Sequence, residues 1–329
     1  MTDSERDPDV LVAGEALVDF LPDSPGLLAQ VAEFSRRAGG APANVAVGLA
    51  RLDATPWFWT RVGEDPFGDH LAGTLASFGV PDRFVERDPA AKTALAFVSH
   101  DEDADRAFTF YRDGTADTRV EPGGVPDETL ESVEWVYVGG VMLAADPGRT
   151  ATLDLAERAG ERGATVVFDP NYRPELWATS DRAYSDLIAE MLGHADVVKA
   201  TPEDLDAAGF EGESPEGLAS AVADDGPHTV LLTLGDAGAF AAATDRAPWG
   251  AGAASHGGYG VDAVDTTGAG DAFTAGALAA LADGDGAGAA DRSLSAVLGF
   301  ANAVAAVTTT AAGAMTALPT REQVRALRE

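Results

Sequence analysis

The sequence predicts an α/β fold with a mostly parallel central sheet, and three observations support this. Short apolar runs alternate with helical patterns through most of the 329 residues, as βαβ units require. The chain has 46% hydrophobic residues and no cysteine, so neither disulfides nor thiolate-bound metal can hold it together. No internal repeat or low-complexity linker interrupts the alternation, which favours a single domain over residues 1–329.

The expected elements follow from the apolar periodicity along the chain. Strands of the main sheet are expected over residues 10–13, 57–62, 135–138, 165–168, 196–199 and 230–233. Helices are expected over residues 43–52, 67–78, 149–162, 182–192, 215–223, 271–281 and 294–307. Strands that alternate with helices in this way form a parallel sheet whose faces the helices cover.

Two stretches depart from this rhythm and predict a smaller second sheet. The first, residues 16–37, offers one short strand and a turn around 22–26. The second, residues 93–112, reads as a hairpin in which TALAFVS and AFTFYR alternate apolar and polar residues around the loop HDEDADR. We expect about 16–37 and 93–115 to project from the main body as a lid over a ligand.

The charge balance excludes two classes of partner. The chain has 54 Asp and Glu against 22 Lys and Arg, a formal net charge of −32, and its only lysines are Lys92 and Lys199. Such a protein repels nucleic acid and anionic lipid. The carboxylates are spread along the chain, which favours a solvated acidic surface over an acidic tail. Repulsion among these charges would loosen the fold in dilute buffer, and about 1 M salt removes most of that repulsion because it shortens the Debye length to about 3 Å. We therefore expect a protein of a halophile's cytoplasm.

Export and membrane insertion are also not expected. The first residues, MTDSERDPDVLVAGEALVDF, lack the basic start and apolar core of a signal peptide. The long uncharged stretch 293–320 is rich in Ala, Thr and Gly and contains Asn302, so a buried helix and turn explain it better than a membrane span.

The segment DTTGAGD, residues 265–271, is the strongest candidate for chemistry. The chain has no GxxxxGK[ST] loop, no HRD and DFG pair and no GxGxxG after its first strand. Gly268, Ala269 and Gly270 precede a predicted helix, where their N–H groups can bind a phosphoryl group. Asp271 beside that anion is suited to accept a proton from an attacking hydroxyl. On these residues alone, Asp271 could equally be a helix cap and the glycines an ordinary turn.

A second Gly-rich segment, AGGAPANVAVGLARL, also precedes a helix. Gly39 and Gly40 would expose N–H groups to a polar ligand, and Asn44 would add an amide in the first helical turn.

These two segments carry a resemblance to a known family. GGAPANVAVGLARL with TRVGEDPFGDHL, and AVDTTGAGDAFTAG near the C-terminus, resemble the two signatures of the ribokinase/PfkB family of carbohydrate kinases. AGEALVDFLP, KTALAFVS, AFTFYR, FDPNYRPELW and TTTAAGAMTALP occur in the order typical of fructokinases. The resemblance covers nearly the whole chain. It implies a ribokinase-like three-layer fold with a β-sheet lid, and an enzyme that transfers the γ-phosphoryl group of ATP to a primary hydroxyl of fructose.

The resemblance also implies roles for individual residues. Asp271 becomes the catalytic base, and Gly268, Ala269 and Gly270 become the anion hole. The implied sugar ligands are Asp19, Gly39, Gly40, Asn44, Asn171, Arg112 and Arg173. Asp19 could instead cap a strand end and Arg112 could pair with a carboxylate, whereas Asn171 and Arg173 follow a strand's carboxyl end, where α/β sheets bind ligands.

The nucleotide and cation sites are implied in the same way. The expected ATP-binding residues are Lys199, Thr233, Gly235, Gly238 and Asn302, with an ordinary β-turn as the alternative for the two glycines. Many family members carry an Asn-x-x-Glu motif after the strand that is expected here over residues 196–199. This chain has Thr201 and Asp204 at those two positions. Asp204 is the expected contact to Mg²⁺ through water, and a K⁺ ion is expected near Asp265 and Gly313.

Two alternative functions remain open from the sequence. A 2-keto-3-deoxygluconate kinase would have the same NYRP segment and an arginine after the lid strand, as Arg112 is here. Such enzymes tend to carry Tyr where this chain has Phe110. A non-catalytic sugar-binding protein would not need Asp271. The sequence fixes neither the phosphorylated position, C1 or C6, nor the oligomeric state, for which we expect a homodimer formed through the lid.

Overall fold

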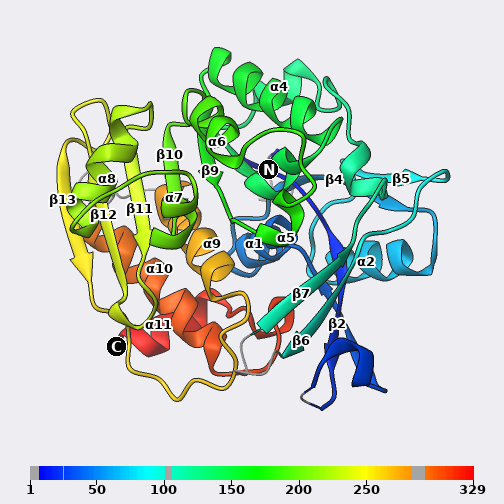
Figure 1. The fold of residues 1–329 in the computed structure, drawn as a ribbon. Helices are drawn as coiled ribbons and strands as arrows, with labels where there is room; N and C mark the ends of the chain where they lie inside the picture. Colours follow the sequence, from blue (N-terminus) through cyan, green and yellow to red (C-terminus); the bar gives the residue numbers. More distant parts are fainter. Residues whose placement is uncertain (1–6, 25, 101–105, 283–292) are drawn as a thin grey trace, which may run out of the picture.

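The computed structural model describes residues 7–24, 26–100, 106–282 and 293–329. Its main feature is a nine-stranded sheet with the order β13-β12-β11-β10-β9-β8-β1-β4-β5 (Figure 1). The strands are β1 (Val10–Ala13), β4 (Trp57–Gly63), β5 (Val85–Asp88), β8 (Trp135–Gly139), β9 (Thr165–Asp169), β10 (Val197–Ala200), β11 (Thr229–Thr233), β12 (Ala239–Ala243) and β13 (Gly252–His256). Pairing is parallel from β11 to β5, and β12 runs antiparallel to both of its neighbours.

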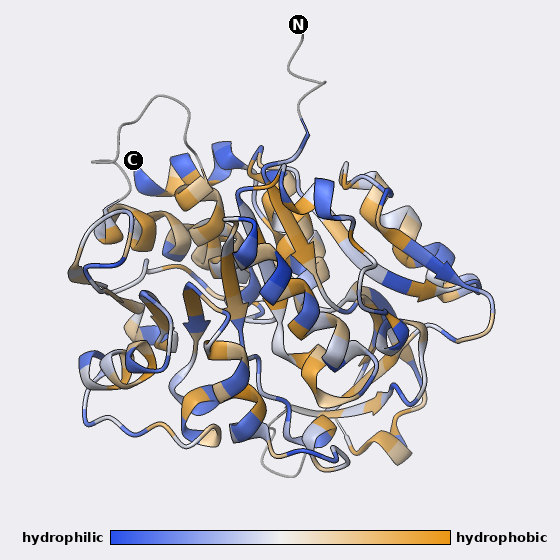
Figure 2. Ribbon diagram, turned by 90° about the horizontal axis from the view of Figure 1, so that it is seen from above, coloured by the Kyte–Doolittle hydropathy of each residue, from blue (hydrophilic) through white to orange (hydrophobic). Residues whose placement is uncertain are grey.

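Helices cover both faces of this sheet, which gives three layers (Figures 1 and 2). One face carries α1 (Ala41–Arg51), α2 (Pro66–Ser77), α9 (Ala269–Ala282), α10 (Leu294–Thr309) and α11 (Arg321–Arg328). The other carries α4 (Gly148–Glu161), α6 (Tyr184–Leu192) and α8 (Pro215–Asp224). Shorter helices are α3 (Asp127–Leu130), α5 (Pro174–Trp177) and α7 (Pro202–Ala207). The ribokinase-like α/β fold expected from the sequence is therefore confirmed.

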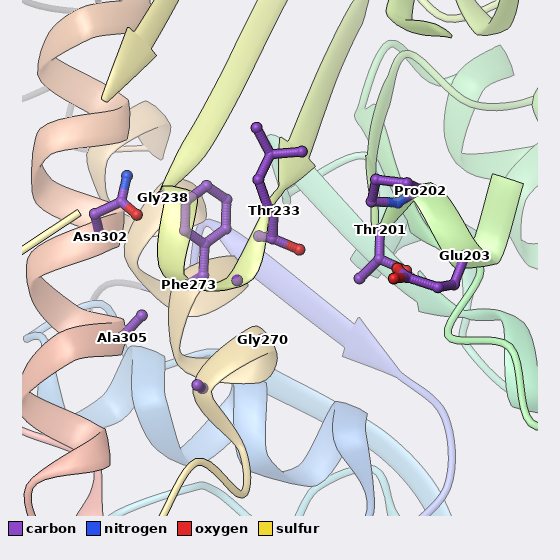
Figure 3. A pocket seen from close by; sticks show the side chains of 12 residues that line it. Thr201, Pro202, Glu203, Thr233, Gly238, Gly270, Phe273, Asn302 and Ala305 are labelled. Carbon is purple, nitrogen blue, oxygen red and sulfur yellow. The ribbon is translucent and has the colours of Figure 1, made fainter. Parts of the chain in front are cut away.

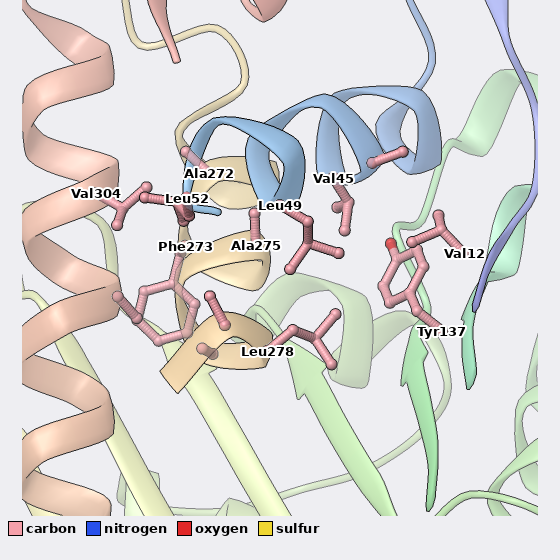
Figure 4. Close-up of a cluster of buried hydrophobic side chains, with 14 of the residues drawn as sticks. Val12, Val45, Leu49, Leu52, Tyr137, Ala272, Phe273, Ala275, Leu278 and Val304 are labelled. Carbon is pink, nitrogen blue, oxygen red and sulfur yellow. The ribbon is translucent and has the colours of Figure 1, made fainter. Parts of the chain in front are cut away.

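The alternation of side chains along each central strand explains why two cores form. Val10 and Val12 of β1 pack into the core under α1 and α9, and Leu11 and Ala13 pack into the core under α4 and α6. The first core also contains Leu49, Phe273 and Val304 (Figure 4). Because both faces are covered, these strands are apolar throughout rather than alternating.

The expected second sheet is present and has four strands in the order β3-β2-β6-β7. They are β2 (Leu17–Pro22), β3 (Phe34–Gly39), β6 (Leu95–His100) and β7 (Arg106–Tyr111). The predicted hairpin is confirmed by the antiparallel pairing of β6 with β7, and most of its expected loop, residues 101–105, lies outside the described residues. The sequence predicted one strand within 16–37, whereas the structure has two, and the second extends to Gly39.

The remaining differences concern weak strand signals and short helices. β5, β12, β13, α3, α5, α7 and α11 were not predicted. Within the residues that the structure describes, no helix combines the length and the apolar character needed to cross a bilayer.

Candidate active site

The turn before helix α9 brings the DTTGAGD segment to the carboxyl ends of the parallel strands. Asp265 shapes this turn, because its Oδ1 accepts hydrogen bonds from the N–H of Thr267 at 2.9 Å and from the hydroxyl of that residue. Its Oδ2 accepts from the N–H of Gly313 at 3.0 Å, which joins the turn to the loop after α10. Gly268 has φ +77°, and a Cβ there would lie 2.8 Å from Ala314, so only glycine fits. The expected proximity of Asp265 and Gly313 is therefore observed.

Asp271 lies in the first turn of α9 and is held by a residue of α1. The Nδ2 of Asn44 donates a hydrogen bond to Oδ2 of Asp271 at 2.7 Å, although 227 residues separate them. Burial raises the pKa of Asp271 to about 6, against the opposing effects of Asn44 and Lys199. A carboxylate with this pKa is ionised at neutral pH and still basic enough to take a proton in a reaction.

Asp271 forms part of a cavity of about 120 Å³ beneath the lid. Five of the predicted sugar ligands line it: Asp19, Gly40, Asn44, Asn171 and Arg173. Phe108 and Phe110 of β7 form its apolar side, with their rings stacked at 5.9 Å. The cavity thus offers carboxylates, amides and one guanidinium to a ligand covered by aromatic rings, as a sugar site does.

Asp19 and Asp271 both line this cavity. Burial raises the pKa of Asp19 to about 7, and the negative charge of Asp271 adds to the rise, while Arg173 opposes it. Gly39 makes room for Asp19, because a Cβ at that position would lie 2.0 Å from Oδ2 of Asp19. Gly39 therefore contributes to the site through the space it leaves.

Arg112 takes the alternative that the sequence left open. It is buried, and its Nε donates to Oδ2 of Asp117 at 2.6 Å while Nη1 donates to the carbonyl of Val141. Arg112 is not among the described residues that line the sugar cavity. The structure therefore places Arg112 in a buried ion pair beside the lining residue Val141, and its contact with the sugar stays a prediction.

A second cavity of about 490 Å³ lies on the other side of the DTTGAGD turn (Figure 3). The predicted nucleotide residues Thr233, Gly235, Gly238 and Asn302 line it together with Ala269 and Gly270. Gly238 has φ +85°, and a Cβ there would lie 2.0 Å from the carbonyl of His256. That close approach makes glycine a requirement of the fold at this position.

A third cavity of about 350 Å³, called the connecting cavity below, shares lining residues with both of the others. It is lined by Gly268, Gly270 and Asp271 on one side and by Lys199 on the other. The Nζ of Lys199 donates to Oδ2 of Asp169 at 3.0 Å. Burial lowers the pKa of Lys199, but the nearby carboxylates of Asp169 and Asp204 outweigh it, so the net shift is upward and the amine stays charged. A cation and the N–H groups at the start of α9 thus adjoin the space where phosphates would lie, and of these the N–H of Ala269 also donates to the carbonyl of Thr266 at 3.2 Å.

Asp204 also lines this third cavity, but its oxygens already have donors. Oδ1 accepts from the N–H of Tyr172 at 2.8 Å, and Oδ2 accepts from the N–H and the hydroxyl of Thr201, both at 2.8 Å. Thr201 and Asp204 form the capping box at the start of α7. Among the described residues no group of three or more His, Cys, Asp or Glu is arranged to hold a metal ion. A divalent ion in this site would therefore take most of its ligands from phosphate and water.

Glu15 is a site residue that the sequence analysis missed. It lies at the corner after β1, is 2% exposed and lines the sugar cavity. Burial raises its pKa to about 7. A carboxylate directly after an apolar strand, as in LVAGEALVD, was the signal that could have identified it.

Comparisons with known proteins agree with this geometry. The family model described as pfkB family carbohydrate kinase matches residues 7–321. A fructokinase of Klebsiella pneumoniae is 38% identical over 319 residues, which cover 96% of this chain and 98% of that protein. Probable fructokinase-2 of Arabidopsis thaliana is 36% identical, with 97% and 96% covered.

Solved structures agree as well. A fructokinase of Xylella fastidiosa with bound ATP superposes with a TM-score of 0.84 at 31% identity and covers 97% of each chain. A double mutant of the Vibrio cholerae O395 fructokinase, in a form with fructose, ADP and potassium ion bound, gives a TM-score of 0.83 at 33% identity, with 99% of this chain and 100% of that chain covered. The chain belongs to the PfkB family of carbohydrate kinases.

Proposed function

We propose that this protein is an ATP-dependent fructokinase that transfers the γ-phosphoryl group of ATP to a primary hydroxyl of fructose. One observation carries the proposal. The turn from Gly268 to Asp271 lies where the sugar cavity, the connecting cavity and the nucleotide cavity meet. A base and an anion-binding turn at such a junction serve the transfer of an anionic group between two ligands.

Asp271 would act as the general base. Held by Asn44, its carboxylate accepts the proton of the sugar hydroxyl as that oxygen attacks phosphorus. The N–H groups of Gly268, Ala269 and Gly270 bind the charge that develops on the transferred group, and Lys199 adds a positive charge on the connecting side. A Mg²⁺ ion carried by the nucleotide, with Asp204 reached through water, would neutralise charge on the phosphates.

The sugar cavity supports fructose as the acceptor. Asp19, Asn44 and Asn171 offer hydrogen-bonding groups for hydroxyls, and Phe108 and Phe110 cover an uncharged ring. The similarity to fructokinases, both in sequence and in solved structures, supports the same substrate. Arg173 in the lining is the one feature that favours an acidic sugar, so 2-keto-3-deoxygluconate is the second candidate.

A monovalent cation belongs to the proposal too. The loop that Asp265 ties to Gly313 adjoins the anion-binding turn. The Vibrio cholerae structure holds a potassium ion together with fructose and ADP. We propose that K⁺ binds next to this loop and stabilises the turn.

The lid is the proposed contact with a second copy of the chain. Tyr111 of β7 is 59% exposed and lies edge-on to Phe97, which stacks on Phe20. An exposed aromatic edge on a projecting sheet suits a homodimer formed through the lid. Light scattering of the purified protein checks this state. We further propose that the enzyme works in the cytoplasm of a halophile, as the net charge of −32 suggests.

Product analysis tests the proposed activity. The purified protein would be incubated with ATP, Mg²⁺ and a panel of sugars in about 1 M KCl, which screens the acidic surface. NMR of the product then distinguishes phosphorylation at C1 from phosphorylation at C6. We expect fructose to be phosphorylated fastest. Fructose binding without ATP-dependent product would favour the non-catalytic alternative.

A further inference from the structure

Glu15 connects the corner after β1 to the start of helix α1. Its Oε1 accepts a hydrogen bond from the N–H of Ala41, the first residue of α1, at 3.2 Å. The sugar-cavity residues Gly40 and Asn44 lie on either side of that bond in the chain. The position of Glu15 therefore affects how this turn of α1 faces the sugar.

The other oxygen of Glu15 lacks a hydrogen-bond partner among the described residues. The same is true of Oδ1 of Asn44, Oδ1 of Asp169 and the hydroxyl of Tyr137, all of which are buried. The two oxygens of Asn44 and Asp169 can only accept. Only Tyr137 can donate among these four groups, unless Glu15 carries a proton.

The backbone places several of these groups near one another. A Cβ on Gly139 would lie 3.9 Å from Oε2 of Glu15, and Gly139 pairs with Asp169 in the sheet. Tyr137 precedes Gly139 by two residues and so shares its face of the sheet. Its hydroxyl points toward α1 (Figure 4). Glu15, Asp169 and Tyr137 thus lie around the end of β8, and of these three Glu15 lines the sugar cavity.

The charged groups around Glu15 do not offset its burial. Burial is the largest influence and raises its pKa; Arg112 opposes this, and Asp117 adds to the rise. Arg112 donates its Nε to Asp117, so its charge is shared with another carboxylate. Across the cavity lie Asp19 and Asp271, both negative when ionised. An ionised Glu15 would be stabilised by the backbone N–H groups of Ala41 and of Glu15 itself, but its Oε2 has no hydrogen-bond partner among the described residues, which is a costly state for a buried charge.

We propose that Glu15 is a positioning residue that works as a neutral carboxylic acid. Its Oε1 accepts the hydrogen bond from the N–H of Ala41, and the proton on Oε2 is donated through an enclosed water to the acceptors around the end of β8. Gly40 and Asn44 are then held against the sugar. Loss of that proton to solvent leaves another negative charge beside Asp19 and Asp271 and weakens sugar binding.

The first test does not depend on the proposed kinase activity. Glu15→Gln keeps the size of the side chain and replaces the O–H donor of the neutral acid with the N–H donors of an amide, which does not titrate. In the wild type the folded-state pKa of Glu15 is raised to about 7 from 4.5, so its stabilising contribution is present below pH 4.5 and is lost as pH rises through 7. The urea midpoint of Glu15→Gln minus that of the wild type should therefore increase from pH 5 to pH 8.

The matched control is Glu131→Gln, which replaces an exposed glutamate far from the cavity. Its midpoint difference from the wild type should stay flat over the same range. A flat difference for Glu15→Gln as well would overturn the proposal, whatever sugar the protein phosphorylates.

The second test uses wild-type protein and rests on the proposed function. If only the neutral form of Glu15 supports binding, a pKa of about 7 makes KM for fructose rise about tenfold from pH 6 to pH 8, because the neutral fraction falls by that factor. KM for ATP should not follow it. Glu15→Gln should remove the rise, and Glu15→Ala should raise KM at every pH. A KM for fructose in the wild type that is constant or falls over this range would contradict the proposal.

Discussion

At the scale of single residues, the sugar cavity contains carboxylates whose pKa values burial raises toward neutral pH. The pKa of Asp19 rises to about 7 and that of Asp271 to about 6, and each of them faces the same small space. The hydrogen bond from Asn44 favours ionisation of Asp271 over that of Asp19. The pair is thereby divided into a base that is ionised at pH 7 and a sugar ligand that is half-protonated there.

The role of Asp271 leads to the first prediction. Asp271→Asn keeps the shape of the side chain but removes the base, so kcat should fall by about 10² to 10⁴ while ATP and fructose still bind. In the wild type, kcat should fall as pH drops below about 6, because the carboxylate takes up a proton. Steady-state kinetics and calorimetric titration measure both. Asp262→Asn, at an exposed position outside the cavities described, is the control, and undiminished turnover in Asp271→Asn would exclude its role as base.

The space beside Asp19 gives the second prediction. Gly39→Ala would place a Cβ 2.0 Å from the present position of Oδ2 of Asp19, so the Asp19 side chain must move. We expect KM for fructose to rise by about tenfold or more, which corresponds to the loss of one charge-assisted hydrogen bond. KM for ATP should remain as in the wild type. The control is Gly73→Ala in the exposed face of α2, where a Cβ meets nothing within 4 Å and should stabilise the helix by about 0.5–1 kcal/mol. Equal KM values for fructose in Gly39→Ala and the wild type would contradict the assignment of Asp19.

Individual residues also show how far the sequence could predict this site. The positions of Asp271, Asn44 and Gly238 followed from motifs, because glycines and capping positions leave a local signature. The partners of Arg112 and Glu15 had no such signature, because the buried ion pair with Asp117 and the bond to Ala41 depend on how the lid and the β1 corner pack. A local pattern can indicate that a side chain belongs to a site, but it does not show which group that side chain contacts.

At the scale of elements, the same reasoning separates what was predicted from what was missed. β1 and β8 are short, fully buried apolar strands and were readily identified. β12 has the sequence AFAAA and β13 has GAASH, both rich in Ala, which has low β-propensity. They become strands because β11 offers an open edge for pairing, a tertiary cause that no window of sequence contains.

The lid strand β7 carries the third prediction. Phe110 covers the sugar cavity without a hydroxyl, so a carboxylate in the ligand would find Arg173 but lose a second partner. A partly unpaired anion gives up about 1–3 kcal/mol, which corresponds to one to two decades in kcat/KM. We expect fructose to exceed 2-keto-3-deoxygluconate by that factor when both are assayed in the same KCl and Mg²⁺. Phe110→Tyr should narrow the gap, and a higher kcat/KM for the acid in the wild type would reverse the substrate assignment and leave the kinase fold intact.

At the scale of the whole molecule, negative charge far exceeds what ion pairs can neutralise. Of the few basic residues, several serve local clusters, such as Arg158 and Arg162, which both bind Asp127. With 22 basic residues for 54 acidic ones, most carboxylates have no cation of their own to balance them. Their repulsion acts over the Debye length, about 10 Å in 0.1 M salt, and so reaches many neighbours at once.

Screening of that repulsion is the basis of the last prediction. Between 0.1 M and about 2 M KCl, where the Debye length falls to about 3 Å or less, the thermal midpoint should rise by about 5 °C or more, equivalent to a few kcal/mol for a chain of this size. Scanning calorimetry over a KCl series measures it, and a parallel NaCl series separates general screening from a K⁺ ion bound near Asp265. Two parallel curves would mean that screening of the surface dominates, whereas a larger rise in KCl alone would indicate an additional contribution from the cation site. A midpoint that does not change with either salt would show that the net charge of −32 does not limit stability, and would remove the physical basis for a halophilic origin.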